Sequence, residues 1–306
     1  MMKVLVAGCG DLGMRAAALL CGSGHEVLGL RRNPLRLSSR PSPLTVHATS
    51  SGSVNPSDSS TGIPKSSGFS WFTGDLMNPA SLSALPTDIS HVIFAASPDQ
   101  RQESAYRELF INGMQNLVAA LRSSKIKRFM FISSSAVYGE HGDQWVDERT
   151  PADPLGFNGR VLVEAEQWLM SQPFETVILR LSGIYGPGRD QLLDRIRQGV
   201  ATVPRHELHW SNRIHIEDAT RAVFHLMDFP EPENIYLVTD GKPYPMDMLY
   251  DRLAQRLGSM LPPEGPAPMM IGSKKLSNAR LLSTGLQLRW PDALIGYANL
   301  IDQASG

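Results

Sequence analysis

The sequence contains only two cysteines, Cys9 and Cys21, among its 306 residues. Both flank a glycine-rich stretch that we interpret below as a buried turn and helix, so a framework of disulfide bonds is excluded. A reducing compartment is the simplest interpretation of this cysteine content. We therefore expect a cytoplasmic protein.

Long apolar runs and an excess of one charge are also missing. No apolar stretch approaches the ~18 residues that a membrane-spanning helix needs, so we expect no membrane partner. Lysine and arginine number 29 against 30 aspartates and glutamates, which gives a net charge of -1. Non-specific binding to nucleic acid depends on an excess of positive charge, so we expect no nucleic-acid partner.

Apolar residues make up 42% of the chain, which is enough for a folded core, and they occur in short runs with helical stretches between them. Strands that alternate with helices in this way predict a parallel sheet covered on both faces. The expected strands are Val4–Ala7, Glu26–Leu30, Phe69–Phe72, His91–Ala96, Arg128–Ile132, Thr176–Leu181 and Ile235–Val238.

One segment, Ser38–Gly68, departs from this alternation because it consists mostly of Ser, Thr, Pro and Gly. Such a composition has few large apolar side chains to offset the entropy of ordering. We interpret it as a flexible surface insertion between the second and third strands. Its serines also leave open a regulatory phosphorylation loop.

A glycine motif follows the first strand and precedes a predicted helix over Met14–Cys21. In this context Gly8 permits a tight turn, Gly10 lets a pyrophosphate approach the backbone, and Gly13 lets helix and strand pack closely. The positive end of the helix would then face the phosphates. The motif predicts a dinucleotide-binding site, with a bare structural turn as the alternative.

The end of the second strand discriminates between cofactors. NAD sites place an acidic residue ~20 residues beyond the glycines, whereas this chain has Arg31 and Arg32 there. Two guanidinium groups suit a 2′-phosphate, unless both simply point into solvent. We predict that NADP(H) is preferred over NAD(H). The predicted cofactor-binding residues are Gly8, Gly10, Asp11, Leu12, Gly13, Arg31, Arg32, Asp75, Leu76, Ala95, Ala96 and Ser97.

The fold class that these features predict is α/β: a Rossmann-type, doubly wound parallel sheet with a smaller C-terminal substrate-binding lobe. We expect a dinucleotide-binding domain over residues 1–175. Residues 176–306 would be mainly the substrate-binding lobe, with some strands returning to the sheet.

Three further blocks, residues 132–139, 180–189 and 213–219, carry a resemblance that covers nearly the whole chain. With the glycine turn they resemble the extended and atypical short-chain dehydrogenase/reductases, the superfamily of nucleotide-sugar epimerases and dehydratases. Residues 273–281 look like the tail of a bacterial atypical, epimerase-like branch. The resemblance implies a small carbonyl, alcohol or nucleotide-sugar-type substrate. It also implies a homodimer formed through helices over residues 102–123 and 157–170.

The resemblance implies that the hydroxyl of Ser134 bonds the reacting oxygen, with Ser133 and Ser135 as alternatives in register. The family's main catalytic pair is a Tyr and, four residues on, a Lys. Those positions here hold Asn158 and Leu162, or Phe157 and Val161 in the other register, so no acid, base or ammonium is supplied.

Other residues could stand in for the missing pair. Tyr138 and His141 are titratable candidates near Ser134, and Arg160 could supply positive charge. Tyr185 and Arg189 would form a substrate wall, and Arg213 resembles a position that holds an acidic or phosphorylated group. The candidates are thus Ser134, Tyr138 and Ser135 for catalysis, and His141, Arg160, Tyr185, Arg189 and Arg213 for the substrate.

Three functions follow as alternatives. The first is an NADP(H)-dependent oxidoreductase or epimerase/dehydratase-like enzyme with a rearranged proton path. The second is a dinucleotide-binding sensor or scaffold that has lost the chemistry. The third is a non-redox isomerase or cyclase that uses the same pocket. We expect no metal, because His206, His209 and His215 lack the spacing of metal ligands.

Overall fold

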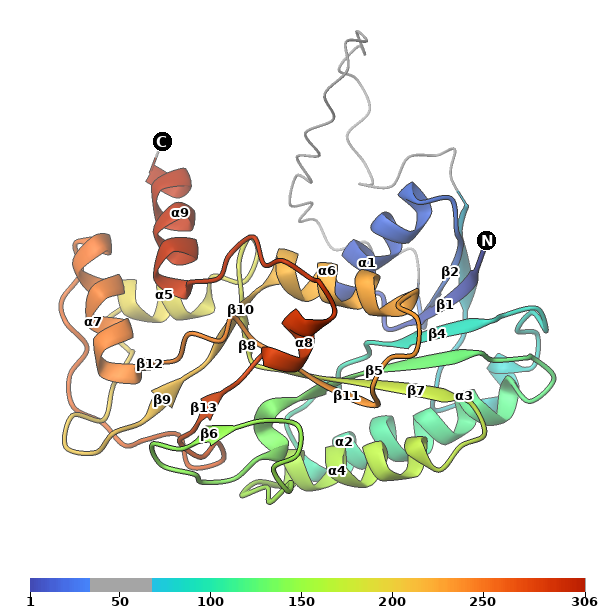
Figure 1. The fold of residues 1–306 in the computed structure, drawn as a ribbon, viewed down its shortest axis with the longest axis horizontal. Helices are drawn as coiled ribbons and strands as arrows, with labels where there is room; N and C mark the ends of the chain where they lie inside the picture. Colours follow the sequence, from blue (N-terminus) through green and yellow to red (C-terminus); the bar gives the residue numbers. More distant parts are fainter. Residues whose placement is uncertain (34–67, 306) are drawn as a thin grey trace, which may run out of the picture.

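The computed structural model describes residues 1–33 and 68–305. Its centre is a seven-stranded parallel sheet in the order β11-β7-β5-β4-β1-β2-β3 (Figure 1). Each apolar run predicted from the sequence forms one of these strands, which confirms the predicted doubly wound α/β fold. The strands are β1 (Lys3–Ala7), β2 (Glu26–Arg31), β3 (Phe69–Thr73), β4 (His91–Phe94), β5 (Arg128–Ser134), β7 (Glu175–Leu181) and β11 (Ile235–Val238).

The strand order reverses direction between β1 and β4. From β1 the chain runs outward through β2 and β3, and it then returns to the other side of β1 to form β4. In open parallel sheets the crevice at such a reversal, outside the carboxyl ends of the strands, is where ligands bind.

Helices cover both faces of the sheet (Figure 1). Residues 102–123, predicted as one long helix, contain a π-helical stretch between two α-helical pieces. One face carries α1 (Asp11–Gly22) and α6 (Ile216–Met227). The other carries α2 (Glu103–Arg107), the π-helical η2 (Glu108–Gly113), α3 (Met114–Ala120) and α4 (Phe157–Met170).

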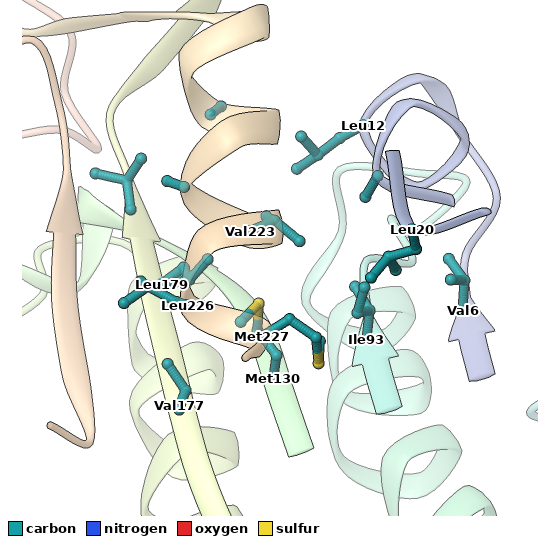
Figure 2. Packing of buried hydrophobic residues seen from close by; sticks show 14 of the residues in the cluster. Val6, Leu12, Leu20, Ile93, Met130, Val177, Leu179, Val223, Leu226 and Met227 are labelled. Atoms are coloured by element: carbon teal, nitrogen blue, oxygen red, sulfur yellow. The ribbon is translucent and has the colours of Figure 1, made fainter. Parts of the chain in front are cut away.

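Figure 2 shows how the first of these faces is packed. Leu20 of α1 and Leu226 and Met227 of α6 lie against apolar side chains that project from the strands, among them Ile93 and Met130. All of these side chains are buried. The packing therefore fixes α1 and α6 to the sheet as one body.

After β7 the chain builds a second, smaller core and also returns to the sheet through α6 and β11. This lobe lies beyond the carboxyl ends of the strands (Figure 1). Its helices are α5 (Gln191–Arg197), α7 (Met246–Leu257) and α9 (Ala293–Ser305). The short strand pairs are β8 (Gly183–Tyr185) with β10 (Arg213–His215), β9 (Trp210–Ser211) with β12 (Tyr244–Pro245), and β6 (Trp145–Val146) with β13 (Lys275–Leu276).

The remaining described elements are single turns: η1 (Pro79–Leu82), η3 (Ser135–Val137) and α8 (Ala279–Ser283). The insertion predicted for residues 38–68 lies outside the described residues, apart from Gly68, which directly precedes β3.

The carboxyl end of α6 is held by Arg128, a buried residue at the start of β5. Its Nη1 atom donates to the carbonyl oxygens of Leu226 at 2.6 Å and Met227 at 2.8 Å. Its Nη2 atom donates to that of Phe229 at 2.8 Å, and its Nε atom pairs with Glu175. One guanidinium group thus satisfies the last carbonyls of the helix and anchors it to the sheet.

We expect Arg128→Met to lower the free energy of unfolding by about 3 kcal/mol or more, because it leaves buried carbonyls and the Glu175 carboxylate without a donor. Chemical denaturation measures this change. The matched control is Arg149→Met, at an exposed arginine, which should cost no more than about 0.5 kcal/mol. Equal stabilities of the two variants would contradict the anchoring role.

Candidate functional site

The glycine turn between β1 and α1 is shaped by three different contacts. Gly8 has a φ of +98°, and a Cβ there would lie 2.2 Å from the backbone nitrogen of Ala96. A Cβ on Gly13 would lie 2.3 Å from the carbonyl oxygen of Gly8. A Cβ on Gly10 would meet nothing within 4 Å. The first and third glycines therefore permit close packing, and the middle one leaves its backbone open to a ligand.

A cavity of about 600 Å³ lies at the strand reversal, next to this turn. The cavity is lined by segments that are far apart in the sequence. They are the carboxyl ends of β1, β2, β3 and β4, together with residues of α2 and η2. Of the predicted cofactor residues, it is lined by Gly8, Gly10, Arg31, Arg32, Asp75, Leu76, Ala95, Ala96 and Ser97. Asp11, Leu12 and Gly13 are not part of the lining, and Leu12 is buried in the core between α1 and the sheet.

The two arginines at the rim of this cavity are held differently. The Arg31 guanidinium lies 5.4 Å from the ring centre of Trp71. Arg32 donates through Nη2 to Oδ1 of Asp99 at 2.8 Å, and both side chains are exposed. This hydrogen bond raises the pKa of Arg32 further, so its charge is permanent. A phosphate group at this rim would meet two cations, one of them already paired.

Several residues of the lining were not predicted from the sequence, most importantly Asp99. Its position could have indicated this role, because Asp99 follows β4 closely and lies at the same edge of the sheet as Ala96. Asp75 is built into a local turn, because its Oδ1 atom accepts a hydrogen bond from the backbone nitrogen of Met77 at 3.0 Å. Both carboxylates lower the net positive charge of the rim.

Ser134 is the last residue of β5, at the same edge of the sheet but outside the lining of the cavity. Its Oγ atom accepts a hydrogen bond from the backbone nitrogen of Ala136 at 3.2 Å, which caps η3. The neighbouring Ser133 is buried and donates to Glu166 at 2.5 Å. Because consecutive strand residues face opposite sides, Ser134 faces away from this buried pair. Its hydroxyl proton stays available to a ligand.

Tyr138 lies in the core, 1% exposed. Its hydroxyl accepts a hydrogen bond from Nη1 of Arg180 at 2.7 Å and donates to the carbonyl of Asp147 at 3.1 Å. Burial raises the pKa of Tyr138 to about 12. Arg180 is itself paired with the buried Glu166 at 2.5 Å. These contacts give Tyr138 a structural role and argue against it as the proton donor.

The first turn of α4 carries the residues at the positions of the missing catalytic pair. Asn158 is 7% exposed, and its Oδ1 atom is buried without a hydrogen-bond partner in the described part of the chain. Leu162 is buried in the core, and Phe157 packs edge-on against Tyr106. Arg160 is exposed and donates to the carbonyl of Leu155 at 3.1 Å, at the surface. The helix thus presents an amide where the family has a phenol.

Of the residues predicted to form the substrate side, Tyr185 and Arg213 lie on the paired strands β8 and β10, whereas the other three, His141, Arg160 and Arg189, lie on other segments. Tyr185 is fully buried, stacked on Tyr297 at 4.2 Å between ring centres, so it cannot form an exposed wall. Arg189 pairs with Asp11 at the glycine turn. His141 lies on the loop after β5, and its Nε2 atom is buried without a partner among residues 1–33 and 68–305.

Arg213 lies where β10 pairs with β8 and its guanidinium flanks the exposed Gly183, since a Cβ there would lie 2.6 Å from Nη1. Its Nε atom, the hydroxyl of Tyr185 and Oδ2 of Asp240 are buried polar atoms without partners in the described structure. The backbone nitrogen of Asp240 donates to the carbonyl of Arg213 at 2.8 Å. Unpartnered buried polar atoms are costly, so this part of the lobe is built to receive polar groups or water.

We expect the stability of the protein to depend on pH through Asp240. Burial raises the pKa of this carboxyl to about 7, against about 3.9 in the unfolded chain. Between these two pKa values, ionisation of Asp240 lowers the free energy of unfolding progressively as the pH rises. Below the lower value it has no effect. The free energy of unfolding of Asp240→Asn, minus that of the wild type, should rise between about pH 4 and pH 7 and then level off. A difference that stays constant across this window would contradict the buried, charge-destabilised carboxyl.

Residues 1–33 and 68–305 contain neither a metal-ligand cluster nor a membrane-spanning helix. No group of three or more His, Cys, Asp or Glu side chains there could hold a metal ion. None of the helices in this part of the chain is both long and apolar enough to cross a membrane.

Comparison with known proteins places this geometry in a family. The model of the NAD dependent epimerase/dehydratase family matches residues 4–238. Protein YeeZ of Escherichia coli strain K12 is 33% identical over 191 residues, which are 61% of this chain and 68% of that protein.

Several solved structures match the chain over its whole length, including one from Methylobacillus flagellatus and one from Thermus thermophilus. A protein of Methylobacillus flagellatus, described as a candidate NAD-dependent epimerase/dehydratase, is 32% identical with a TM-score of 0.75, over 100% of this chain and 99% of that one. The UDP-glucose 4-epimerase of Thermus thermophilus, solved with NAD, shares the fold with a TM-score of 0.75 at 22% identity, over 100% and 99% of the two chains. The resemblance seen in the sequence is thereby confirmed, and the chain belongs to the NAD-dependent epimerase/dehydratase family.

Proposed function

We propose that this chain binds NADP(H) in preference to NAD(H) and is an oxidoreductase or epimerase/dehydratase-like enzyme. Its substrate would be a small carbonyl, alcohol or nucleotide-sugar-type compound. The observation that carries the proposal is the cavity at the strand reversal, where the open backbone of Gly10 and the guanidinium groups of Arg31 and Arg32 meet. The NAD in the structure of the Thermus epimerase supports a dinucleotide at this edge of the fold.

The residues present fit such a cofactor. Gly10 leaves room for a diphosphate beside the first turn of α1, whose backbone N–H groups point outward without intrahelical acceptors. Arg31 and Arg32 would bind a 2′-phosphate on the adenosine ribose through charge and hydrogen bonds. When bound, the nicotinamide supplies or accepts a hydride.

Ser134 would hold the reacting oxygen. Because its oxygen already accepts from the backbone of Ala136, its proton is free to bond a carbonyl or alcohol oxygen of the substrate. Asn158 can orient such a group by hydrogen bonding but cannot take up or release a proton. Of the titratable residues suggested by the sequence, His141 has a ring nitrogen without a hydrogen-bond partner in the described residues. We therefore assign proton transfer to His141 or to water.

Arg213 would bind an acidic or phosphorylated part of the substrate. Its guanidinium flanks Gly183, an exposed residue just beyond the end of β7, and β7 pairs with the strand that carries Ser134. Arginine is suited to this task because its planar group bonds carboxylates and phosphates in pairs.

A second candidate function is a dinucleotide-binding sensor or scaffold. The observations that favour it are the amide of Asn158 and the apolar Leu162 at the catalytic positions, together with the buried hydroxyl of Tyr138. A protein of this kind would bind the cofactor and change its affinity for a partner without consuming substrate.

A homodimer and a cytoplasmic location also remain proposals. Gly113 and Leu117, which lie in the first of the two segments predicted to form the dimer, are buried and cannot form an open interface. A dimer would instead use the outer faces of α2 and α4, where Arg107 and Glu164 pair at 3.0 Å. The two buried free thiols, Cys9 and Cys21, fit a reducing compartment.

We expect the wild type to bind NADPH more tightly than NADH in fluorescence titrations. Arg32→Gln should weaken NADPH binding about tenfold or more and leave NADH binding nearly unchanged, because only NADPH carries the 2′-phosphate. Arg160→Gln, at an exposed arginine away from the cavity, is the matched control and should change neither affinity. Equal losses for both cofactors would refute the assignment of Arg32 to the 2′-phosphate.

We expect Ser134→Ala to reduce cofactor-dependent turnover at least about a hundredfold, as the loss of a donor to a developing charge does. The assay would screen carbonyl and nucleotide-sugar substrates with NADPH. Tyr138→Phe should keep most of the turnover of the folded protein, because its hydroxyl faces Arg180 and not a ligand. Activity that survives in Ser134→Ala would contradict the proposed role, and a wild type that binds cofactor without any turnover would favour the sensor.

A further inference from the structure

The carboxylate of Asp11 is shared by two arginines from different parts of the fold. Arg15, one turn along α1, reaches Oδ1 through its Nε atom at 2.7 Å. Arg189, from the turn between β8 and α5, reaches Oδ2 through its Nε atom at 2.9 Å. Nη2 of Arg15 also donates to the carbonyl of Pro187 at 3.3 Å. The contacts with Arg189 and Pro187 join the second lobe directly to the start of α1, beside the glycine turn.

The turn that carries Arg189 is held in a fixed position. The backbone nitrogen of Arg189 donates to the carbonyl of Gly186 at 2.9 Å. Gly186 has a φ of +133°, and a Cβ there would lie 2.6 Å from Cγ2 of Ile216 and 3.0 Å from Nε2 of His215. The turn is therefore wedged against the start of α6, which itself packs on α1. The guanidinium group of Arg189 is presented at one place rather than left to swing freely.

Asp11 itself is a poor neighbour for a diphosphate. It is the first residue of α1 and follows Gly10, whose backbone is open to the ligand. A carboxylate at that position repels the phosphates electrostatically. Arg15 and Arg189 neutralise it and leave one net positive charge. Nε is the atom through which Arg189 pairs, and its two Nη atoms have no partner in residues 1–33 and 68–305.

We propose that Arg189 is part of the cofactor's diphosphate site, contributed by the second lobe, and that Asp11 positions it there. The role rests on the proposed function, since it requires a dinucleotide on the glycine turn. It replaces the substrate wall that the sequence predicted for this residue.

The experiment is a titration with ADP, which carries the diphosphate, and with adenosine, which does not. Arg189→Gln should weaken ADP binding about tenfold because a charged hydrogen bond is lost. Asp11→Asn should tighten ADP binding about threefold, because the amide removes a like charge while its oxygen can still accept the hydrogen bond that positions Arg189. Adenosine binding should not change in either variant. The matched controls are Arg197→Gln and Asp194→Asn, an exposed pair on α5 that should leave ADP binding unaltered.

The opposite signs separate this role from a merely structural contact. If the pair only joins the lobes, both variants weaken that contact and ADP affinity changes in the same direction or in neither, which would overturn the proposal. Arg189→Lys, which keeps the charge, should stay within about threefold of the wild type and guards against a folding defect. A wild type that binds neither ADP nor NADPH would refute the proposed function itself.

Discussion

The backbone of Gly8 passes so close to that of Ala96 that no side chain fits between them. This single contact joins the end of β1 to the segment after β4, the two strands at which the sheet reverses its order. It also sets the direction in which α1 leaves the turn. The open backbone of Gly10 and the free N–H groups of α1 then face the cavity because Gly8 has fixed the turn behind them.

A chain of packing contacts extends from this turn to the second lobe. Leu20 of α1 and Leu226 of α6 belong to the same buried cluster, and α6 is anchored at its carboxyl end by Arg128. Its other end supports the turn at Gly186. The position of the second lobe relative to the cofactor site is therefore set through α1 and α6. A ligand on the glycine turn acts on the same elements that hold the lobe.

The strands and the glycine turn were predictable because each depends on a local pattern, a short apolar run or glycines at fixed spacing. The roles of Tyr138 and Tyr185 were not predictable, because the sequence does not show whether a tyrosine hydroxyl contacts a substrate or is buried in the core. Their burial depends on Arg180 and Tyr297, which are remote in sequence. The partners of Arg32 and Arg189 escaped prediction for the same reason: Asp99 and Asp11 are 67 and 178 residues away.

The buried network around Glu166 explains how Ser134 can be well placed although the usual catalytic pair is absent. Glu166 binds both Ser133 and Arg180, so the end of β5 is tied to α4 and β7. A hydroxyl at the next residue is then held by a rigid strand end. At the first turn of α4 the chain carries the amide of Asn158 in place of an acid.

The most direct test of this account is a crystal structure of the protein with NADPH. The account predicts the diphosphate against Gly10 and the start of α1, with the 2′-phosphate between Arg31 and Arg32. NADPH bound elsewhere on the chain, or no bound NADPH at saturating concentration, would contradict it.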